Sequence, residues 1–256
     1  MIKVKILFIF YILSLNMLAV GQSLVNNDLK ICLHGGYFPY KIKKIDGSWD
    51  GYDVAIMKDF SSYLQKKPQF IDVEWVSIIP SLLSKKCDVI SVGLVKNAER
   101  EKVVLYGDNV YDNNLVLIML KNPVNLSKFK SISDFIRQKK TVGVAQGTSS
   151  ALFAAKTNLN TVVFKTFDAP ILALLEHKVD AVIFEDHYIV SLPTEVKKKI
   201  FILDDKVNKE EVSAAFRLED KSLQQKFNHF LKIWLKTNKK KNYENLYFNS
   251  KFSRSI

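Results

Sequence analysis

The sequence predicts an α/β protein built as two lobes with a cleft between them. Apolar runs of strand length alternate with helical segments, one of these strands is apolar almost throughout, and 256 residues are enough for two packed units. A nearly continuous apolar strand is typical of a parallel sheet covered by helices on both faces. We therefore expect each lobe to contain a central, mainly parallel sheet flanked by helices.

The N-terminus has the pattern of an export signal. Residues 1–5 are basic, residues 6–19 form an apolar run with two polar interruptions, and small residues surround Gly21. The apolar run is shorter than the roughly 20 residues that a membrane span needs. We expect a cleavable signal peptide over residues 1–21, and an uncleaved membrane anchor is the less favoured alternative.

After a first strand that begins at Leu29, the chain predicts a helix and a second strand. Apolar residues recur at helical spacing between about Asp53 and Leu64, which indicates a helix with one buried face. A strand is expected over residues 71–75, ending at Trp75.

The segment from Ile79 to Arg100 carries the most informative pattern. It predicts a helix, a buried strand over residues 88–93, a tight loop and a new helix start. Gly93 would mark the carboxyl end of the strand, where open α/β sheets bind ligands. Asn97 can cap the helix, and Arg100 would lie where backbone amides and a guanidinium bind one carboxylate. The alternative is a surface arginine paired with a neighbouring acid.

A second set of elements follows the apolar run at residues 115–120. The elements expected there are a helix start at 133–134, a strand over 141–145 and a helix opened by Asp168 and Pro170.

The order of elements predicts that the chain leaves the first lobe and later returns to it. A strand over residues 213–217 and an amphipathic helix from Leu223 to Trp234 would complete the first lobe. We place lobe 1 at residues 22–111 and 213–256, and lobe 2 at residues 112–212. Two crossing strands would form a hinge, and a small ligand that contacts both walls of the cleft would stabilise the closed form.

The two cysteines are expected to be buried free thiols. Cys32 lies in the first strand and Cys87 precedes the third, so we expect their Cα atoms to be further apart than the about 7 Å that a disulfide can span.

The net charge of +12 does not point to nucleic acid. The lysine runs at residues 139–140, 197–199 and 239–241 lie apart from one another, beside expected helix ends or loops. A nucleic-acid surface would combine basic and aromatic residues on one face, and the sequence has no such module. We expect no nucleic-acid partner.

Four motifs, read in order, resemble those of one family. They are Leu29–Tyr40 with Asp46–Asp53, Ile79–Arg100, Val142–Ser150 and Leu174–Glu185. Together they resemble the periplasmic amino-acid-binding proteins of ABC transporters, which are bacterial solute-binding proteins of family 3 with the type II periplasmic binding fold. The resemblance implies a periplasmic monomer, not an enzyme, which captures an amino acid or close analogue without cofactor or metal and delivers it to a membrane ABC permease.

The resemblance also implies which residues contact the ligand. Arg100 would bind the ligand carboxylate, and the Gly93 carbonyl and the Val95 amide would make main-chain contacts to the ligand. Thr148 and Ser149 would add a second carboxylate contact, and Glu185 would bind the ammonium group. Tyr37, Trp75 and His34 would surround the ligand side chain. The alternatives without a ligand are purely structural: a helix cap for Thr148, core packing for Trp75 and a hydrogen bond that holds His34 in place.

Two positions depart from the family pattern, and a third bears on the ligand. Val95 stands where the family usually has Ser or Thr, so it offers no hydroxyl, and Glu185 stands where the family has Asp. If the motif is aligned one residue further along the chain, Asp186 would face the cleft instead. His34 takes a place where relatives that bind cationic amino acids carry an acid, which favours a ligand with a polar neutral or acidic side chain.

The alternative function is a periplasmic cyclohexadienyl dehydratase, acting on prephenate or arogenate with the same fold. A buried acid with a raised pKa would donate the proton, and Glu185 is the candidate. A hydrolase is not expected because no G-x-S-x-G motif accompanies residues 34–36. Residues 185–187 lack the spacing of metal ligands.

Overall fold

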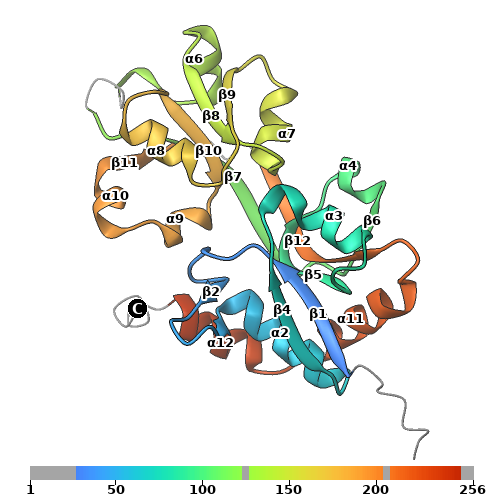
Figure 1. Ribbon diagram of the computed structural model, residues 1–256. Coiled ribbons are helices and arrows are strands. Elements are labelled where there is room, and N and C mark those ends of the chain that lie inside the picture. Colours follow the sequence, from blue (N-terminus) through green and yellow to red (C-terminus); the bar gives the residue numbers. More distant parts are fainter. Residues whose placement is uncertain (1–26, 123–126, 204–207, 249–256) are drawn as a thin grey trace, which may run out of the picture.

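The computed structural model describes residues 27–122, 127–203 and 208–248, and it has two lobes joined by two long strands (Figure 1). The signal peptide predicted over residues 1–21 lies outside these ranges. Within them, every helix is too short or too polar to span a bilayer.

The first lobe contains a sheet in which β1 lies between β4 and β5 and runs parallel to both. Its strands are β1 (Asp28–Leu33), β4 (Lys67–Asp72), β5 (Val89–Val95) and β6 (Val104–Tyr106), with the separate hairpin β2 (Ile42–Lys43) and β3 (Trp49–Asp50). Its helices are α2 (Tyr52–Tyr63), the 3-10 turn η1 (Trp75–Ser77), α3 (Ile78–Leu83), α4 (Ala98–Glu101), α11 (Lys221–Trp234) and α12 (Lys239–Phe248).

The second lobe repeats this plan, with β8 between β9 and β10 and parallel to both. Its strands are β8 (Thr141–Ala145), β9 (Asn160–Phe164), β10 (Ala181–Glu185) and β11 (Ile200–Ile202). Its helices are α6 (Ile132–Arg137), α7 (Ser149–Ala155), α8 (Ala169–Leu175), α9 (Tyr188–Ser191) and α10 (Thr194–Lys199).

Two strands cross between the lobes, β7 (Tyr111–Leu120) and β12 (Asn208–Arg217). They pair antiparallel with each other over residues 111–115 and 208–212. Beyond that ribbon, β7 pairs with β10 and β11 of the second lobe, whereas β12 pairs with β5 and β6 of the first. The predicted lobe boundaries fall within this ribbon, and its action as a hinge remains a prediction.

Each lobe has its own apolar core. In the first lobe, α2 and α11 pack together on the sheet, and the rings of Phe60 and Phe227 meet edge to face at 5.1 Å. The buried residues of α11 are Phe227, Phe230, Leu231 and Trp234, as its predicted amphipathic pattern requires. In the second lobe, two separate clusters contain the side chains of β7, β8 and β10. The cleft therefore lies between two independently packed units.

Several predicted boundaries were wrong. The strand expected over residues 213–217 begins at Asn208, and the helix expected to start at 133–134 begins at Ile132. β5 continues past Gly93 to Val95, because Val95 still pairs with Val212 of β12. β4 ends at Asp72, where its partner β1 ends at Leu33, so Trp75 begins the turn η1 instead of ending a strand.

The prediction of two free thiols was also wrong. Cys32 and Cys87 form a disulfide with their Cα atoms 5.6 Å apart. Strand β5, which begins two residues after Cys87, pairs directly with β1, which contains Cys32, so the two cysteines lie close together. Chain order did not reveal this adjacency, because β4 lies on the other side of β1.

Reducing this disulfide should lower the free energy of unfolding by about 2–4 kcal/mol, since the bond closes a long loop in the unfolded chain. Urea unfolding with and without reductant measures the difference. As a control, the double variant Cys32→Ala with Cys87→Ala should unfold at one midpoint under both conditions. Equal midpoints for the wild-type protein would contradict this role.

Candidate functional site

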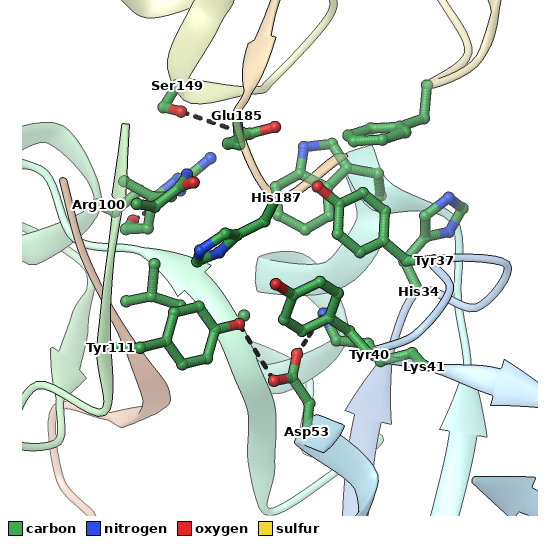
Figure 2. A pocket seen from close by; sticks show the side chains of 16 residues that line it. His34, Tyr37, Tyr40, Lys41, Asp53, Arg100, Tyr111, Ser149, Glu185 and His187 are labelled. Atoms are coloured by element: carbon green, nitrogen blue, oxygen red, sulfur yellow. Dashed lines mark hydrogen bonds and ion pairs between the residues drawn. The ribbon is translucent and has the colours of Figure 1, made fainter. Parts of the chain in front are cut away.

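A cavity of about 580 Å³, its mouth included, opens between the two lobes (Figure 2). Eight of the nine predicted site residues line it. Those from the first lobe are His34, Tyr37, Trp75, Gly93, Val95 and Arg100, and those from the second are Ser149 and Glu185. The sequence motifs thus identify both walls of one cavity, although the residues are far apart along the chain.

Arg100 is held in place by both lobes. Asn97 caps α4 as predicted, since its side-chain oxygen accepts a hydrogen bond from the Arg100 backbone N–H at 3.0 Å. The guanidinium donates through Nη1 to the Val95 carbonyl at 2.7 Å and through Nη2 to the Gly147 carbonyl at 2.8 Å. With 7% of its surface exposed, Arg100 is buried, so the alternative of a surface arginine does not hold.

The Gly147 carbonyl of the second lobe is also an acceptor for Trp75. The indole Nε1 donates to it at 3.1 Å, and the Arg100 guanidinium lies 5.5 Å from the centre of the Trp75 ring. Arg100 and Trp75 of the first lobe therefore contact the same peptide group of the second lobe, which holds the two lobes together at this edge of the cavity.

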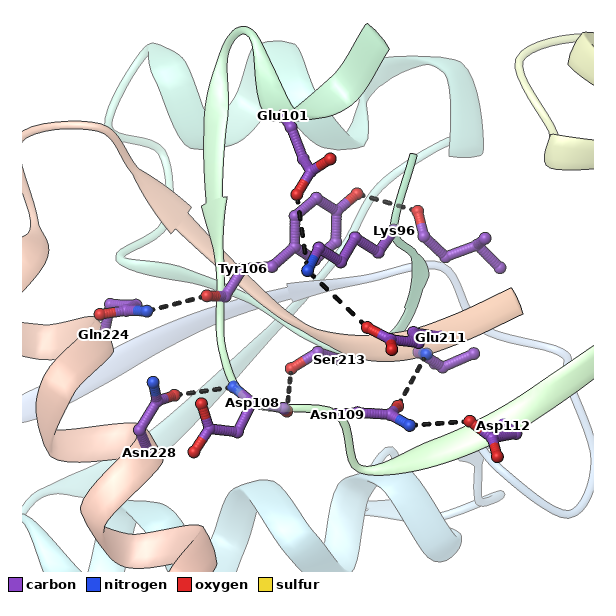
Figure 3. Close-up of polar contacts among 12 residues, drawn as sticks. Lys96, Glu101, Tyr106, Asp108, Asn109, Asp112, Glu211, Ser213, Gln224 and Asn228 are labelled. Atoms are coloured by element: carbon purple, nitrogen blue, oxygen red, sulfur yellow. Dashed lines mark hydrogen bonds and ion pairs between the residues drawn. The ribbon is translucent and has the colours of Figure 1, made fainter. Parts of the chain in front are cut away.

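The Val95 carbonyl has a second donor in the Tyr106 hydroxyl, at 2.9 Å (Figure 3). Its neighbour Lys96 lies 3.6 Å from Glu101 and 3.7 Å from Glu211, but these groups are exposed and their pairing adds little stability. Val95, although it has no hydroxyl of its own, thus contributes a carbonyl that fixes the position of Arg100.

Thr148 does not line the cavity. Its hydroxyl accepts from the Ala151 N–H at 3.2 Å and donates to the Ala145 carbonyl at 2.7 Å, so Thr148 caps α7. Both of these hydrogen bonds lie within its own loop, so the structure shows the helix cap, and a ligand contact by Thr148 stays a prediction. The neighbouring Ser149 faces the cavity instead.

Glu185, and not Asp186, lies at the cavity wall. Asp186 accepts hydrogen bonds from the backbone and side chain of Asn114, at 3.3 and 2.7 Å, which turns it away toward β7. Strand alternation at the end of β10 sends these adjacent side chains in different directions.

Two acids share the hydroxyl of Ser149. Ser149 Oγ lies 3.2 Å from Glu185 Oε1 and 2.9 Å from Glu210 Oε2. One hydroxyl has a single hydrogen, so it cannot donate to both carboxylates at once. Burial, followed by the charge of Glu185, raises the pKa of Glu210 to about 7, and burial also raises the pKa of Glu185. Both carboxyl groups therefore lose their protons at a higher pH than an exposed glutamate does.

The sequence reasoning missed a second charged pair in the cavity. Lys41 Nζ lies 3.2 Å from Asp53 Oδ2, and the Tyr111 hydroxyl donates to Asp53 Oδ1 at 3.1 Å. Burial raises the pKa of Asp53 to about 6 although Lys41 and Tyr111 lower it. Asp53 belongs to one of the four family motifs, so the sequence could have indicated that it lies near the site. Nothing in the sequence placed Lys41 beside it.

Aromatic rings form much of the remaining wall. Tyr37 lies 5.6 Å from Phe167 and 5.7 Å from Tyr188 between ring centres, and Tyr40 stacks on His187 at 5.5 Å. Burial lowers the pKa of His187, which keeps it neutral at pH 7. The cavity therefore combines aromatic surface with a few charged groups.

His34 is fixed by a main-chain contact. Its Nδ1 lies 3.0 Å from the Val73 carbonyl, which can only accept, so Nδ1 carries the proton. Within the part of the chain that the structure describes, histidine, cysteine and acidic side chains form no group that could hold a metal ion.

The raised pKa of Glu210 should make stability fall as pH rises from about 4.5 to about 7, because the folded state binds this proton more tightly than the unfolded state. Between pH 5 and 8, the free energy of unfolding of the wild type should fall by about 1–3 kcal/mol more than that of the Glu210→Gln variant. Urea unfolding across this range measures the loss. Glu211→Gln, an exposed neighbour, should behave like the wild type, and parallel profiles for all three proteins would refute the assignment.

The sequence and the fold of this chain are similar to those of known proteins. Residues 29–250 match the model of the family described as bacterial extracellular solute-binding proteins, family 3. A histidine-binding periplasmic protein of Escherichia coli (strain K12) is 24% identical over 151 residues, which are 59% of this chain and 56% of that protein. The chain thus spans just over half the length of that relative.

Two further proteins align over most of the chain. A putative ABC transporter arginine-binding protein 2 of Escherichia coli (strain K12) is 26% identical over 226 residues, which are 86% of this chain and 88% of that protein. The structure of holo ArgBP from T. maritima superposes with a TM-score of 0.74 at 26% identity, covering 87% of this chain and 96% of that one. With its two lobes and the cavity between them, the chain belongs to the family 3 bacterial extracellular solute-binding proteins.

Proposed function

We propose that this protein is exported to the periplasm, captures an amino acid or a close analogue between its lobes and delivers it to a membrane ABC permease. One observation carries the proposal: a buried guanidinium from the first lobe, Arg100, and a carboxylate from the second, Glu185, line the same cavity. An α-amino acid has a group of opposite charge for each of them.

The chemistry of the two groups supports this assignment. A ligand carboxylate loses its hydration in the cavity and needs a charged donor, and a guanidinium carries five N–H donors in a planar fork. Two donors of Arg100 go to carbonyls, so the side chain is held in place and still has capacity for a ligand. Glu185, with Ser149 beside it, can accept from an ammonium group.

Hydrogen bonds hold the end of the hinge region that joins the first lobe, and this supports lobe closure as the functional motion. The Asp108 N–H donates to Asn228 Oδ1 at 2.8 Å, and Ser213 Oγ donates to the Asp108 carbonyl at 2.8 Å (Figure 3). The Val212 N–H donates to Asn109 Oδ1 at 3.1 Å. These contacts fix the entry to β7 against β12 and α11, so bending would occur in the ribbon beyond them.

Location in the periplasm is supported by the leader pattern and by the disulfide. Disulfides persist mainly in oxidising compartments such as the periplasm. One relative named above is described as a periplasmic histidine-binding protein and another as an arginine-binding protein. The proposal in this form names no particular amino acid as the ligand.

A ligand that fits should raise the melting temperature markedly, because ligand at one hundred times its dissociation constant adds about 2.7 kcal/mol to the free energy of unfolding. A thermal-shift panel of the twenty amino acids, opines, small peptides and prephenate tests this. Arg100→Ala should abolish the shift and keep the fold, whereas Arg137→Ala, on the exposed side of α6, should preserve it. The absence of a shift with every compound would exclude the proposal.

The dehydratase remains a second candidate, because burial raises the pKa of Glu185 as a proton donor requires. Incubation of the purified protein with prephenate or arogenate distinguishes the two functions. A binding protein should return the compound unchanged, and formation of the aromatic product, lost in Glu185→Gln, would establish the enzyme instead.

A further inference from the structure

Lys41 and Asp53 form a charged pair at the cavity wall, apart from Arg100 and Glu185 (Figure 2). Only 9% of the Lys41 side chain and none of the Asp53 side chain is exposed. Both groups line the cavity, and the function proposed above gives neither of them a role.

The surrounding backbone is shaped to hold this pair. Gly93 has a φ of +109°, and a Cβ atom there would lie 2.2 Å from Lys41 Nζ and 2.7 Å from Asp53 Oδ2. Lys41 and Tyr37 also exchange two backbone hydrogen bonds, at 2.8 and 3.0 Å, which fix the start of the lysine side chain. Any residue other than glycine at position 93 would displace the ammonium group.

The charges of the cavity limit the ligands that it can take. Two of its charged side chains are positive, Lys41 and Arg100, and two are negative, Asp53 and Glu185, so the charges balance. An amino acid's carboxylate and ammonium would engage Arg100 and Glu185, which leaves Lys41 and Asp53 as a neutral pair for the ligand side chain. A charged side chain would bury a net charge, which is costly, whereas a neutral one would not.

Two neighbouring groups change this balance little near pH 7. Glu210 lies behind Ser149 and does not line the cavity, and burial raises its pKa to about 7, so it carries only part of a negative charge at that pH. His187, on the facing second lobe, is neutral because burial lowers its pKa.

The polar groups beside the Lys41–Asp53 pair can form hydrogen bonds with a ligand that carries both a donor and an acceptor. An ammonium group has three N–H donors, and Lys41 Nζ pairs with Asp53. On β7, Asn113 Oδ1 is buried and accepts from no group in the described residues, and Asn113 lines the cavity. A buried acceptor without a donor is costly. An uncharged amide meets both demands, because its C=O can accept from Lys41 and its N–H can donate to Asp53 or Asn113.

We propose that the Lys41–Asp53 pair makes the cavity selective for an amino acid whose side chain ends in an uncharged amide, either a carboxamide or a ureido group. This rests on the amino-acid-binding function proposed above and specifies its substrate class.

Calorimetric titration at pH 7 with matched compounds tests the selectivity. Glutamine, asparagine and citrulline represent the amides, glutamate and aspartate are their acidic counterparts, and arginine, lysine and leucine supply cationic and apolar side chains. The best amide should bind at least tenfold tighter than every charged or apolar compound. If a charged or apolar amino acid binds best, selectivity for amides is overturned and the amino-acid function stands. If no amino acid binds, both proposals fail.

Two variants test whether the pair causes the selectivity. Asp53→Asn leaves the lysine charge uncompensated and should shift the ratio of glutamine to glutamate affinity at least tenfold toward glutamate. Lys41→Met leaves the aspartate and should shift the ratio of glutamine to lysine affinity at least tenfold toward lysine. Lys232→Met, whose lysine is exposed on α11, should retain both wild-type ratios.

Folding of each variant is checked by circular dichroism and melting temperature. Should Asp53→Asn fail to fold, Lys41→Met and the wild-type panel still decide the question. Unchanged ratios in a folded Lys41→Met variant would overturn the role of the pair.

Discussion

The closed arrangement of the cavity depends on the Arg100 guanidinium, which bonds to carbonyls of both lobes. Its two hydrogen bonds go to Val95 in the first lobe and Gly147 in the second, and Trp75 donates to the same Gly147 carbonyl. A buried cation is costly unless such acceptors surround it. The side chain that we propose as the carboxylate-binding group therefore also joins the two walls of the cavity.

The rest of the cavity follows from the same requirement that buried charge be balanced. Lys41 lies against Asp53, Glu185 and Glu210 share the hydroxyl of Ser149, and His187 stays neutral. Aromatic rings form much of the remaining wall, and their low polarity strengthens each electrostatic contact. A ligand that keeps this balance would be favoured over one that disturbs it.

Much of the fold could be predicted because its signals are local. Helix α2, strand β8 and the amphipathic face of α11 follow from apolar spacing within each segment, and Asn97 caps α4 where the pattern placed it. The disulfide could not be predicted in this way. It depends on which strands are neighbours in the sheet, and β5 pairs with β1 although β4 comes between them in the chain.

The sequence by itself determined the order of elements, because hydrophobic spacing and turn chemistry depend on a few consecutive residues, and its resemblance to a known family indicated the motif residues on both walls. Only the tertiary structure decided that Glu185 and not Asp186 faces the cavity, that Thr148 serves as a cap, and that Lys41 meets Asp53 beside Gly93. These outcomes depend on the direction in which a side chain points and on groups that come from distant parts of the chain. No local pattern encodes either of them.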